Sequence, residues 1–437
     1  MVEVAPFKGI TYNKEKIAQL DDVMSPPYDI ISPKMQEELY EKHPNNFVRL
    51  ILGKQFPKDS ETDNRYTRAK KDFDAWQHQE ILKKSNLDSI YPYQISYTMD
   101  GKKKTMNGFF ILLQLDKEYK QVKAHEKTLS KPKADRLELM RACHANLEPI
   151  QLLYIDEKDS IHKKLKKTLQ QEPLIQVKGS DQFIHSLWCE TDQTVISTIQ
   201  EYLQNNILFI ADGHHRYQTA INFAKEQEQK TQNTDPQAPF NYRMVILVNM
   251  FDEGLAILPT HRLLKLQIPD REKLIKQIET YFTVETFKRT PNQKTYLTES
   301  EHIKQQLHKT SQHSFALIFN DSYYILRLKD ESVMKTFAEE QTKTWQHLDV
   351  SILHKILIEH VLQITPETLE DHVKYTRIDE EALSEVDTGT FDCSIIMNPT
   401  KIQELKEVAE ASEHMPQKST YFLPKMLSGL VMYKMEE

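Results

Sequence analysis

One short segment, residues 207–217, constrains the fold of this chain more than any other part of the sequence. Its first five residues, 207–211, are all apolar and predict a buried strand. The apolar residues that follow are spaced as on one face of a helix, at Tyr217, Ala220, Ile221 and Ala224. The sequence therefore predicts a strand that leads directly into a helix, with only a short polar turn between them.

The turn itself has the composition of an anion-binding site. It consists of Asp212, Gly213, His214, His215 and Arg216. The start of a helix directs backbone N–H groups and the positive end of the helix dipole at one point, and glycine lets a ligand approach the backbone closely. The two histidines and the arginine add donors suited to phosphate. A lone histidine is usually a surface or core residue, but this combination at a strand–helix junction favours a phosphate site.

This turn, followed by Ala220, resembles the Gly-x-x-Arg-x-x-x-Ala signature of the ParB–sulfiredoxin superfamily, in which the turn holds phosphates. The superfamily includes free-serine kinases, sulfiredoxins and the nucleotide-binding domain of ParB partition proteins. A sulfiredoxin-like activity needs a cysteine in the turn, where this chain has histidines. DNA binding needs a basic excess, whereas the net charge here is −7.

Further sequence blocks resemble, in order and over nearly the whole chain, those of a large and mainly bacterial family catalogued as domain of unknown function 1015. They are residues 26–31, 46–50, 125–128, Asp135 with Arg136, 145–150, 258–262, 348–354 and 415–425. Members of that family with an assigned activity are similar to free-serine kinases, and some use inorganic pyrophosphate as donor. The resemblance therefore implies phosphoryl transfer to free serine.

We expect an α+β fold of mixed sheets with flanking helices. The chain has 437 residues, enough for two or three domains. We expect an N-terminal α/β region over 1–118, a ParB/sulfiredoxin-like phosphate-binding core over 119–265, and a C-terminal α/β domain over 266–437 that returns a Lys-Ser-Thr segment to the site.

Hydrophobic patterning predicts the individual elements. Helices are expected at 64–85, 135–148, 157–171, 193–204, from 217 onward, and at 270–282, 299–309 and 350–362, the last with Asp349 as its N-cap. Strands are expected at 151–155, 244–248 and 394–397, with hairpins over 91–115 and 314–328. The polar stretch 231–239 is expected to be a mobile or disordered insertion.

Phosphoryl transfer to an alcohol requires neutralisation of the donor's charge, usually with Mg²⁺, and a group that receives the hydroxyl proton. We expect Asp212 or Glu126 as the base, His214 as a further catalytic residue, and Asp212 as the metal ligand. The expected phosphate contacts are Gly213, His214, His215, Arg216, Lys127, Arg136, Lys418, Ser419 and Thr420. The expected substrate contacts are Arg49, His261 and Arg262, of which Arg49 and Arg262 are candidates for the serine carboxylate.

Each of these motifs has a plainer interpretation. Residues 125–128 alone are typical of a solvated charge run. The Lys418–Thr420 segment resembles the end of a phosphate-binding loop, but no glycine-rich stretch precedes it, so it is equally an exposed turn. Asp29 is another candidate acid or part of a rigid turn. A metal-hydrolase site from the turn's histidines is disfavoured, because adjacent histidines at a helix start rarely point the same way.

We expect the protein to be cytoplasmic. The three cysteines form no Cys-x-x-Cys pair, which indicates neither a structural zinc site nor a disulfide framework. The N-terminus lacks the apolar stretch of a signal peptide, and no run approaches the length of a membrane span. We expect no membrane or nucleic-acid partner.

The resemblance and the residues together predict a cytoplasmic, Mg²⁺-dependent kinase of amino-acid metabolism, connected with cysteine biosynthesis. We expect it to transfer phosphate from inorganic pyrophosphate to free L-serine, giving O-phospho-L-serine. The alternatives are an ATP- or ADP-dependent serine kinase, or a non-catalytic ParB-like regulator that binds nucleotide or phosphate. The sequence leaves the oligomeric state open.

Overall fold

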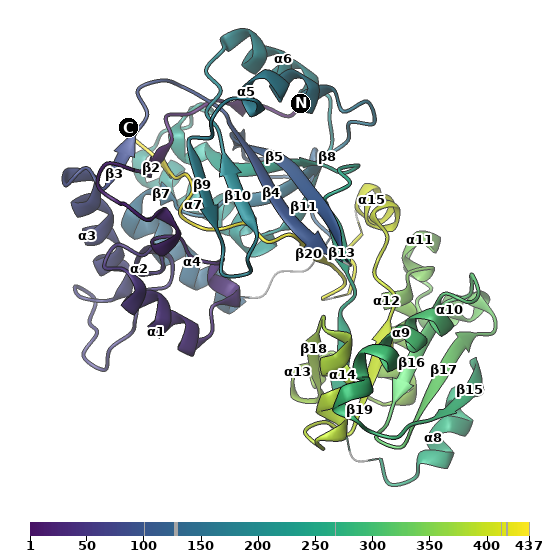
Figure 1. Ribbon diagram of the computed structural model, residues 1–437. Helices are drawn as coiled ribbons and strands as arrows, with labels where there is room; N and C mark the ends of the chain where they lie inside the picture. Colours follow the sequence, from purple (N-terminus) through teal and green to yellow (C-terminus); the bar gives the residue numbers. More distant parts are fainter. Residues whose placement is uncertain (100, 126–129, 267, 412, 417, 437) are drawn as a thin grey trace. The chain divides into compact units, whose positions relative to one another are not determined.

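The computed structural model describes residues 1–99, 101–125, 130–266, 268–411, 413–416 and 418–436. The chain divides into two compact units, drawn with the same labels in Figure 1. Unit 1 contains Met1–Ala124, Thr128–Ala256 and Pro424–Glu437, and unit 2 contains His125–Lys127 and Ile257–Leu423. The three-domain division at residues 118 and 265 stays a prediction.

A large mixed sheet forms the centre of unit 1. Its strands are β1 (Val4–Ala5), β4 (Tyr91–Met99), β5 (Lys102–Gln114), β6 (Val122–Lys123), β8 (Ile150–Tyr154), β9 (Ile175–Lys178), β10 (Ile184–Leu187), β11 (Leu208–Asp212) and β12 (Tyr242–Asn249). Within the described residues the order is β6-β11-β8-β12-β5-β4-β10-β9, with β1 also paired to β5. The β6–β11 and β8–β12 pairs are parallel and the other pairs are antiparallel. The expected hairpin over 91–115 is the β4–β5 pair.

Helices and two small sheets complete unit 1. The helices are η1 (Leu20–Asp22), η2 (Tyr28–Ile30), α1 (Pro33–Lys42), α2 (Val48–Ile51), α3 (Arg65–His78), α4 (Ser130–Cys143), α5 (Ser160–Leu169), α6 (Gln193–Leu203), α7 (His214–Thr231) and η3 (Pro239–Asn241). The small sheets are β2 (Ile10–Tyr12) with β3 (Leu82–Lys84), and β7 (Ala145–Asn146) with β21 (Tyr433–Lys434).

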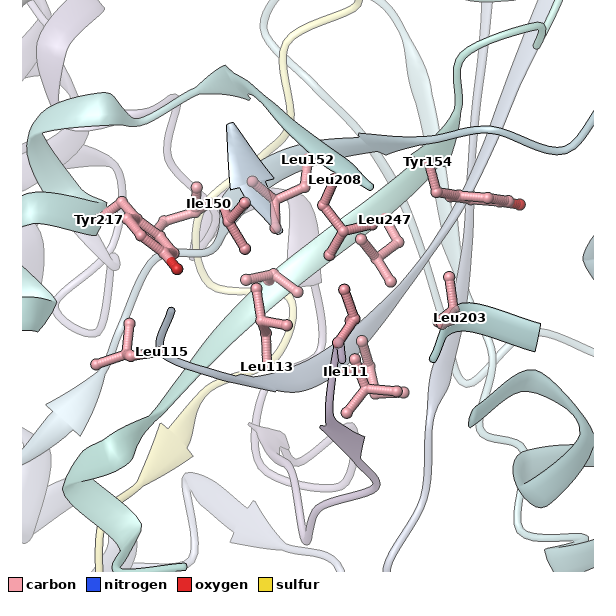
Figure 2. Packing of buried hydrophobic residues seen from close by; sticks show 14 of the residues in the cluster. Ile111, Leu113, Leu115, Ile150, Leu152, Tyr154, Leu203, Leu208, Tyr217 and Leu247 are labelled. Carbon is pink, nitrogen blue, oxygen red and sulfur yellow. The ribbon is translucent and has the colours of Figure 1, made fainter. Parts of the chain in front are cut away.

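The core of unit 1 lies between the large sheet and its helices, and it fixes the position of α7. Alternate residues of β5, β8 and β12 point into it, among them Ile111, Leu152 and Leu247, as Figure 2 shows. The helix face expected from the sequence, which begins at Tyr217, packs into the same cluster. Burial of this face holds the start of α7 directly against the end of β11.

Unit 2 is built on an antiparallel sheet. Its strands are β14 (His261–Leu264), β15 (Phe282–Lys288), β16 (Ser314–Ile318), β17 (Ser322–Leu328), β18 (Val373–Thr376) and β19 (Cys393–Met397). As far as the structure describes the chain, the order is β15-β17-β16-β19-β14-β18, and β13 (Ala256–Leu258) pairs with β20 (Tyr421–Leu423). The helices are α8 (Arg271–Ile278), η4 (Gln293–Thr295), α9 (Tyr296–Leu307), η5 (Glu331–Val333), α10 (Met334–Phe337), α11 (Lys343–Gln346), α12 (Asp349–Ile352), the π-helix η6 (Leu353–Val361), α13 (Leu369–His372), α14 (Asp379–Asp387) and α15 (Ile402–Glu410).

The α+β fold of mixed sheets and flanking helices is therefore confirmed, and several local expectations are corrected. The helix expected over 64–85 ends at His78 and is followed by strand β3, and the helix expected over 135–148 ends at Cys143 and is followed by strand β7. Asp349 is the first residue of α12 and not its N-cap, which is Leu348. The Asp349 carboxylate instead contacts His313 Nδ1 at 2.6 Å. In the polar loop after α7, Pro236 O accepts a hydrogen bond from Gln114 Nε2 at 2.9 Å, and the expected mobility of this loop stays a prediction. No helix in the described ranges is long and apolar enough to cross a membrane.

Candidate functional site

The strand-to-helix turn in unit 1 has the geometry expected from the sequence. Strand β11 ends at Asp212, and Gly213 adopts left-handed backbone angles, φ 94° and ψ 31°. Tyr217 N donates to Gly213 O at 2.9 Å, which places Gly213 at the N-cap of the 18-residue helix α7. A Cβ on Gly213 would lie 3.0 Å from Arg216 Nε. Glycine is therefore required both by the backbone conformation and by the guanidinium group packed against it.

Asp212 binds two cations at this turn. Lys425 Nζ donates to Asp212 Oδ1 at 2.7 Å, and Arg216 Nη2 donates to Oδ2. Burial raises the pKa of Asp212, but the charges of Lys425 and Arg216 outweigh it and hold the pKa well below the usual value. His214, which is buried, adds a smaller effect in the same direction. Asp212 is therefore ionised at neutral pH and fixes two cations beside the start of α7.

A buried network connects Arg216 with Arg136, although the two are far apart in the sequence. Arg216 Nη1 donates to the carbonyl oxygen of Pro149, and the preceding Glu148 accepts from Arg136 Nη1 at 3.2 Å. Glu148 Oε1 also accepts from Ser428 Oγ at 3.1 Å, which connects the C-terminal segment to the network. The structure therefore brings two expected phosphate contacts, Arg136 and Arg216, into one cluster.

The position of Arg136 is fixed from a second side. Its Nε donates to Asp135 Oδ2 at 2.9 Å, and its guanidinium lies 3.9 Å from the centroid of the Tyr28 ring. Asp135 also binds Arg65 and accepts from Tyr66 OH at 2.8 Å. Arg136 is thus a pre-positioned cation with little freedom to move.

A glutamine beside the turn has no partner of its own. Gln151 in β8 lies opposite Asp212 in the antiparallel β8–β11 ladder, so both side chains start on the same face. Its side chain is fully buried, and neither Oε1 nor Nε2 has a hydrogen-bond partner among the described residues. A buried amide without hydrogen bonds destabilises the folded state by about 1–3 kcal/mol. The Gln151 amide is therefore suited to bind a water molecule or a ligand.

The remaining residues of the turn are less buried. His215 is half-buried, and its carbonyl oxygen accepts from Thr219 Oγ1 at 2.7 Å. Its Nδ1 is buried, and the residue lies at the first turn of α7, where an anion is stabilised by the helix dipole.

In unit 2 the structure brings together two motifs that are distant in the sequence. His125 Nε2 lies 3.0 Å from Thr420 Oγ1, and Met415 N donates to His125 O at 2.7 Å. Ser419 is buried and donates to Pro416 O, whereas Lys418 is exposed with φ 57°. The expected residues Glu126 and Lys127 lie outside the described residues.

The expected substrate residues of unit 2 lie on β14. His261 Nε2 is 2.8 Å from Asp379 Oδ1. Arg262 is fully buried, its Nη2 lies 3.1 Å from His354 Nε2, and burial lowers its pKa to about 10. Burial and then the charge of Arg262 lower the pKa of His354 well below the usual value, so His354 is neutral and accepts from the guanidinium.

Arg49, in unit 1, is bound elsewhere. Its guanidinium lies 4.2 Å from the centroid of the Tyr40 ring and donates to Tyr40 O at 3.1 Å. No ion pair or hydrogen bond between described residues connects Arg49 to the Asp212–Arg216 turn. A role for Arg49, His261 or Arg262 in substrate binding stays a prediction.

The described residues do not form a ready-made metal site. No group of three or more His, Cys, Asp or Glu side chains in the described part of the chain is placed to hold a metal ion. Both carboxylate oxygens of Asp212 bind cations. Mg²⁺ prefers several oxygen ligands, so Asp212 as arranged here does not fit that role by itself.

Sequence reasoning missed several members of the cluster. Lys425 was within a recognised block but was not singled out. Glu148, Gln151 and Arg243 each carried a signal, because they are polar residues in or beside the buried strands β8 and β12. An isolated polar residue in an apolar strand indicates a buried hydrogen-bonding role.

Comparison with known proteins identifies the family. Residues 4–351 match the model of the family described as "Protein of unknown function (DUF1015)". The chain therefore belongs to this family, as the sequence blocks predicted. No curated protein matches the sequence.

Three solved structures are among those similar to this chain. A mutant of a free serine kinase in complex with ADP has 13% identity and a TM-score of 0.35, over 74% of this chain and 92% of that one. A conserved hypothetical protein from Pyrococcus furiosus has 15% identity and a TM-score of 0.32, over 74% and 95%. SbnI with a C-terminal truncation, from Staphylococcus aureus, has 11% identity and a TM-score of 0.33, over 71% and 83%.

Proposed function

We propose that this protein is a phosphotransferase that moves a phosphoryl group to the hydroxyl of free L-serine, giving O-phospho-L-serine. The observation that carries the proposal is the turn at Gly213, where a left-handed glycine precedes an 18-residue helix and two cations flank Asp212. Such a turn presents backbone N–H groups, the helix dipole and positive charge to one anion.

In this proposal the buried network makes the turn a preorganised site. Phosphoryl transfer involves little covalent chemistry by the protein, so catalysis depends on positioning and on charge stabilisation. Arg216 and Lys425 are held by Asp212 before any ligand arrives. Their charges need no reorganisation during transfer, and the unpartnered amide of Gln151 offers a further polar contact on the same face.

We propose L-serine as the phosphoryl acceptor because the sequence blocks resemble those of a family whose members with an assigned activity are similar to free-serine kinases. For the donor we propose inorganic pyrophosphate, with ATP or ADP as the alternative. Pyrophosphate has no base or ribose to bury, so its binding depends on dense cationic contacts such as those around Asp212. Lys418, Ser419 and Thr420 are proposed as further contacts to the donor.

The proton acceptor is proposed to be Glu126 or Asp212. A carboxylate whose pKa is held well below its usual value is a weak base at neutral pH, and Asp212 is such a carboxylate. Its two ion pairs suit a positioning role better. The variants Asp212→Asn and Glu126→Gln keep size and hydrogen bonding, so comparing their turnover separates the two roles.

The proposal includes a requirement for Mg²⁺, bound chiefly by the donor's own phosphate oxygens. The described residues do not supply a ligand set for it. Chelation by EDTA followed by re-addition of Mg²⁺ tests the requirement.

Product detection tests the proposal. The purified protein is incubated with L-serine, Mg²⁺ and one donor at a time, namely pyrophosphate, ATP or ADP, and ³¹P NMR is used to find O-phosphoserine. The proposal predicts the product with at least one donor, and with pyrophosphate best. Tight binding of a nucleotide without product from any donor would instead establish the non-catalytic regulator.

A further inference from the structure

A small, partly open cavity lies beside the turn, within unit 1. Its volume is about 30 Å³. It is lined by Arg136, Leu139, Met140, Ala145, Leu147, Glu148, Arg216, Thr219 and Arg243. A cavity of this size holds one or two occupants about as large as a water molecule.

Arg243 is the unusual member of this lining. It stands on the buried strand β12, its side chain is 4% exposed, and its Nη2 donates to Glu148 O at 2.7 Å. Its Nε is buried without a hydrogen-bond partner, and no carboxylate among the described residues forms an ion pair with it. Burial, and then the charges of Arg216 and Arg136, lower its pKa to about 9, although the charge of Glu148 acts in the opposite direction. Among the described residues Arg243 is therefore a buried cation without an ion pair of its own.

The described lining of the cavity carries three arginines, Arg136, Arg216 and Arg243, and one carboxylate, Glu148. Among the described residues, the connected network contains five cations, Arg65, Arg136, Arg216, Arg243 and Lys425, and three carboxylates, Asp135, Glu148 and Asp212. The exposed Asp29 also acts electrostatically on Arg216. Arg136 and Arg216 each form an ion pair with a carboxylate, whereas no ion pair between described residues includes Arg243.

We propose that this cavity binds one small monovalent anion of the halide type, chloride under ordinary conditions, as the counter-charge of Arg243. The size of the cavity suits a monatomic ion, whereas a phosphate group with four oxygens would overfill it. Leu139, Met140 and Leu147 form an apolar wall, and such a wall disfavours a strongly hydrated ion. In this proposal the anion screens Arg243 from Arg216 and so supports the arginine of the turn structurally.

Stability in different salts tests the proposal without any activity assay. Denaturant unfolding is followed in sodium chloride and in sodium gluconate at equal ionic strength. A halide site with a Kd of about 10 mM would raise the folding equilibrium constant roughly tenfold at 100 mM chloride, and gluconate would have no such effect. Equal responses to the two salts would overturn the proposal.

A cavity-filling variant provides the matched control. Ala145 lines the cavity and lies on the short strand β7, so Ala145→Val adds two methyl groups to this space while every charge remains. The proposal predicts that this variant loses the chloride dependence and that Arg243→Gln, which removes the need for a counter-charge, loses it as well. Unchanged chloride dependence in Ala145→Val would contradict the location.

Diffraction from bromide-soaked crystals of the unaltered protein decides the matter even if both variants fail to fold. The expected result is an anomalous peak within about 3.5 Å of Arg243 Nε, unaffected by added pyrophosphate. Absence of a peak, with only water in the cavity, would refute the halide site. Displacement of the peak by pyrophosphate would also refute it, since the cavity would then belong to the donor site.

Discussion

Replacement of Lys425 by methionine should destabilise the protein more than an ordinary surface lysine substitution. Lys425 Nζ lies 2.7 Å from Asp212 Oδ1, and the two side chains are only 14% and 20% exposed. A charge-assisted hydrogen bond of this kind contributes about 1.5–3 kcal/mol. Because Arg216 still pairs with Asp212 in the variant, we expect a loss near the lower end, about 2 kcal/mol in the free energy of unfolding at pH 7.

The loss should depend on pH in a defined direction. The pKa of Asp212 is depressed in the folded protein, so its contribution to stability is fully present above the unfolded pKa, near 4. That contribution is lost as the pH falls toward the folded pKa. The difference between wild type and Lys425→Met should therefore be constant from about pH 5 to 7 and should shrink below about pH 4. Urea unfolding at a series of pH values measures it.

Lys434→Met on the same C-terminal segment is the matched control. Lys434 pairs with Asp74 at 3.5 Å, with side chains 29% and 42% exposed, and a pair of this kind contributes at most about 1 kcal/mol. Equal losses in the two variants, or a loss in Lys425→Met that does not change with pH, would refute the assigned role of the Lys425–Asp212 pair.

Three further outcomes follow from the site. Gly213→Ala should abolish donor binding and lower the free energy of unfolding by about 1–3 kcal/mol, because the new Cβ meets the Arg216 guanidinium. The control is Gly389→Ala: Gly389 also has a positive φ, 72°, but nothing lies within 4 Å of the added Cβ, so this variant has the backbone strain without the contact. Lys418→Met should raise the donor KM about ten- to hundredfold and leave the serine KM unchanged; an unchanged donor KM would make this segment a surface turn. Glu126→Gln should reduce turnover at least about 10²-fold and Asp212→Asn less, if Glu126 is the base; the reverse order would assign that role to Asp212.

The sequence was sufficient to predict the turn and the α+β class because both depend on local patterns. The apolar run before Asp212 and the helical spacing after Tyr217 each specify one element, and their junction then follows. Several of the longer helices and strands, among them α6, β5 and β12, were predicted for the same reason. The order of strands in the sheets could not be predicted, since it depends on pairings between segments far apart in the chain.

The residues that contact the turn could not be predicted either, because they lie far from it in the sequence. Lys425 follows Asp212 by 213 residues, and no periodicity connects them. Gln151 and Arg243 were visible as polar residues in apolar strands, but their burial without full hydrogen bonding appears only once the sheet and helices are assembled. Long-range charge pairing is thus the part of this site that sequence patterns specify least.

The central claim is that the Asp212–Arg216 turn holds the phosphates of the donor. A crystal structure of the protein with L-serine and methylenediphosphonate, a pyrophosphate analogue that cannot be cleaved, tests it most directly. We expect a phosphonate group within about 3 Å of backbone N–H groups at the start of α7, the position at which helices bind anions. Density for the analogue at any other place, with this turn unliganded at saturating concentration, would contradict the account.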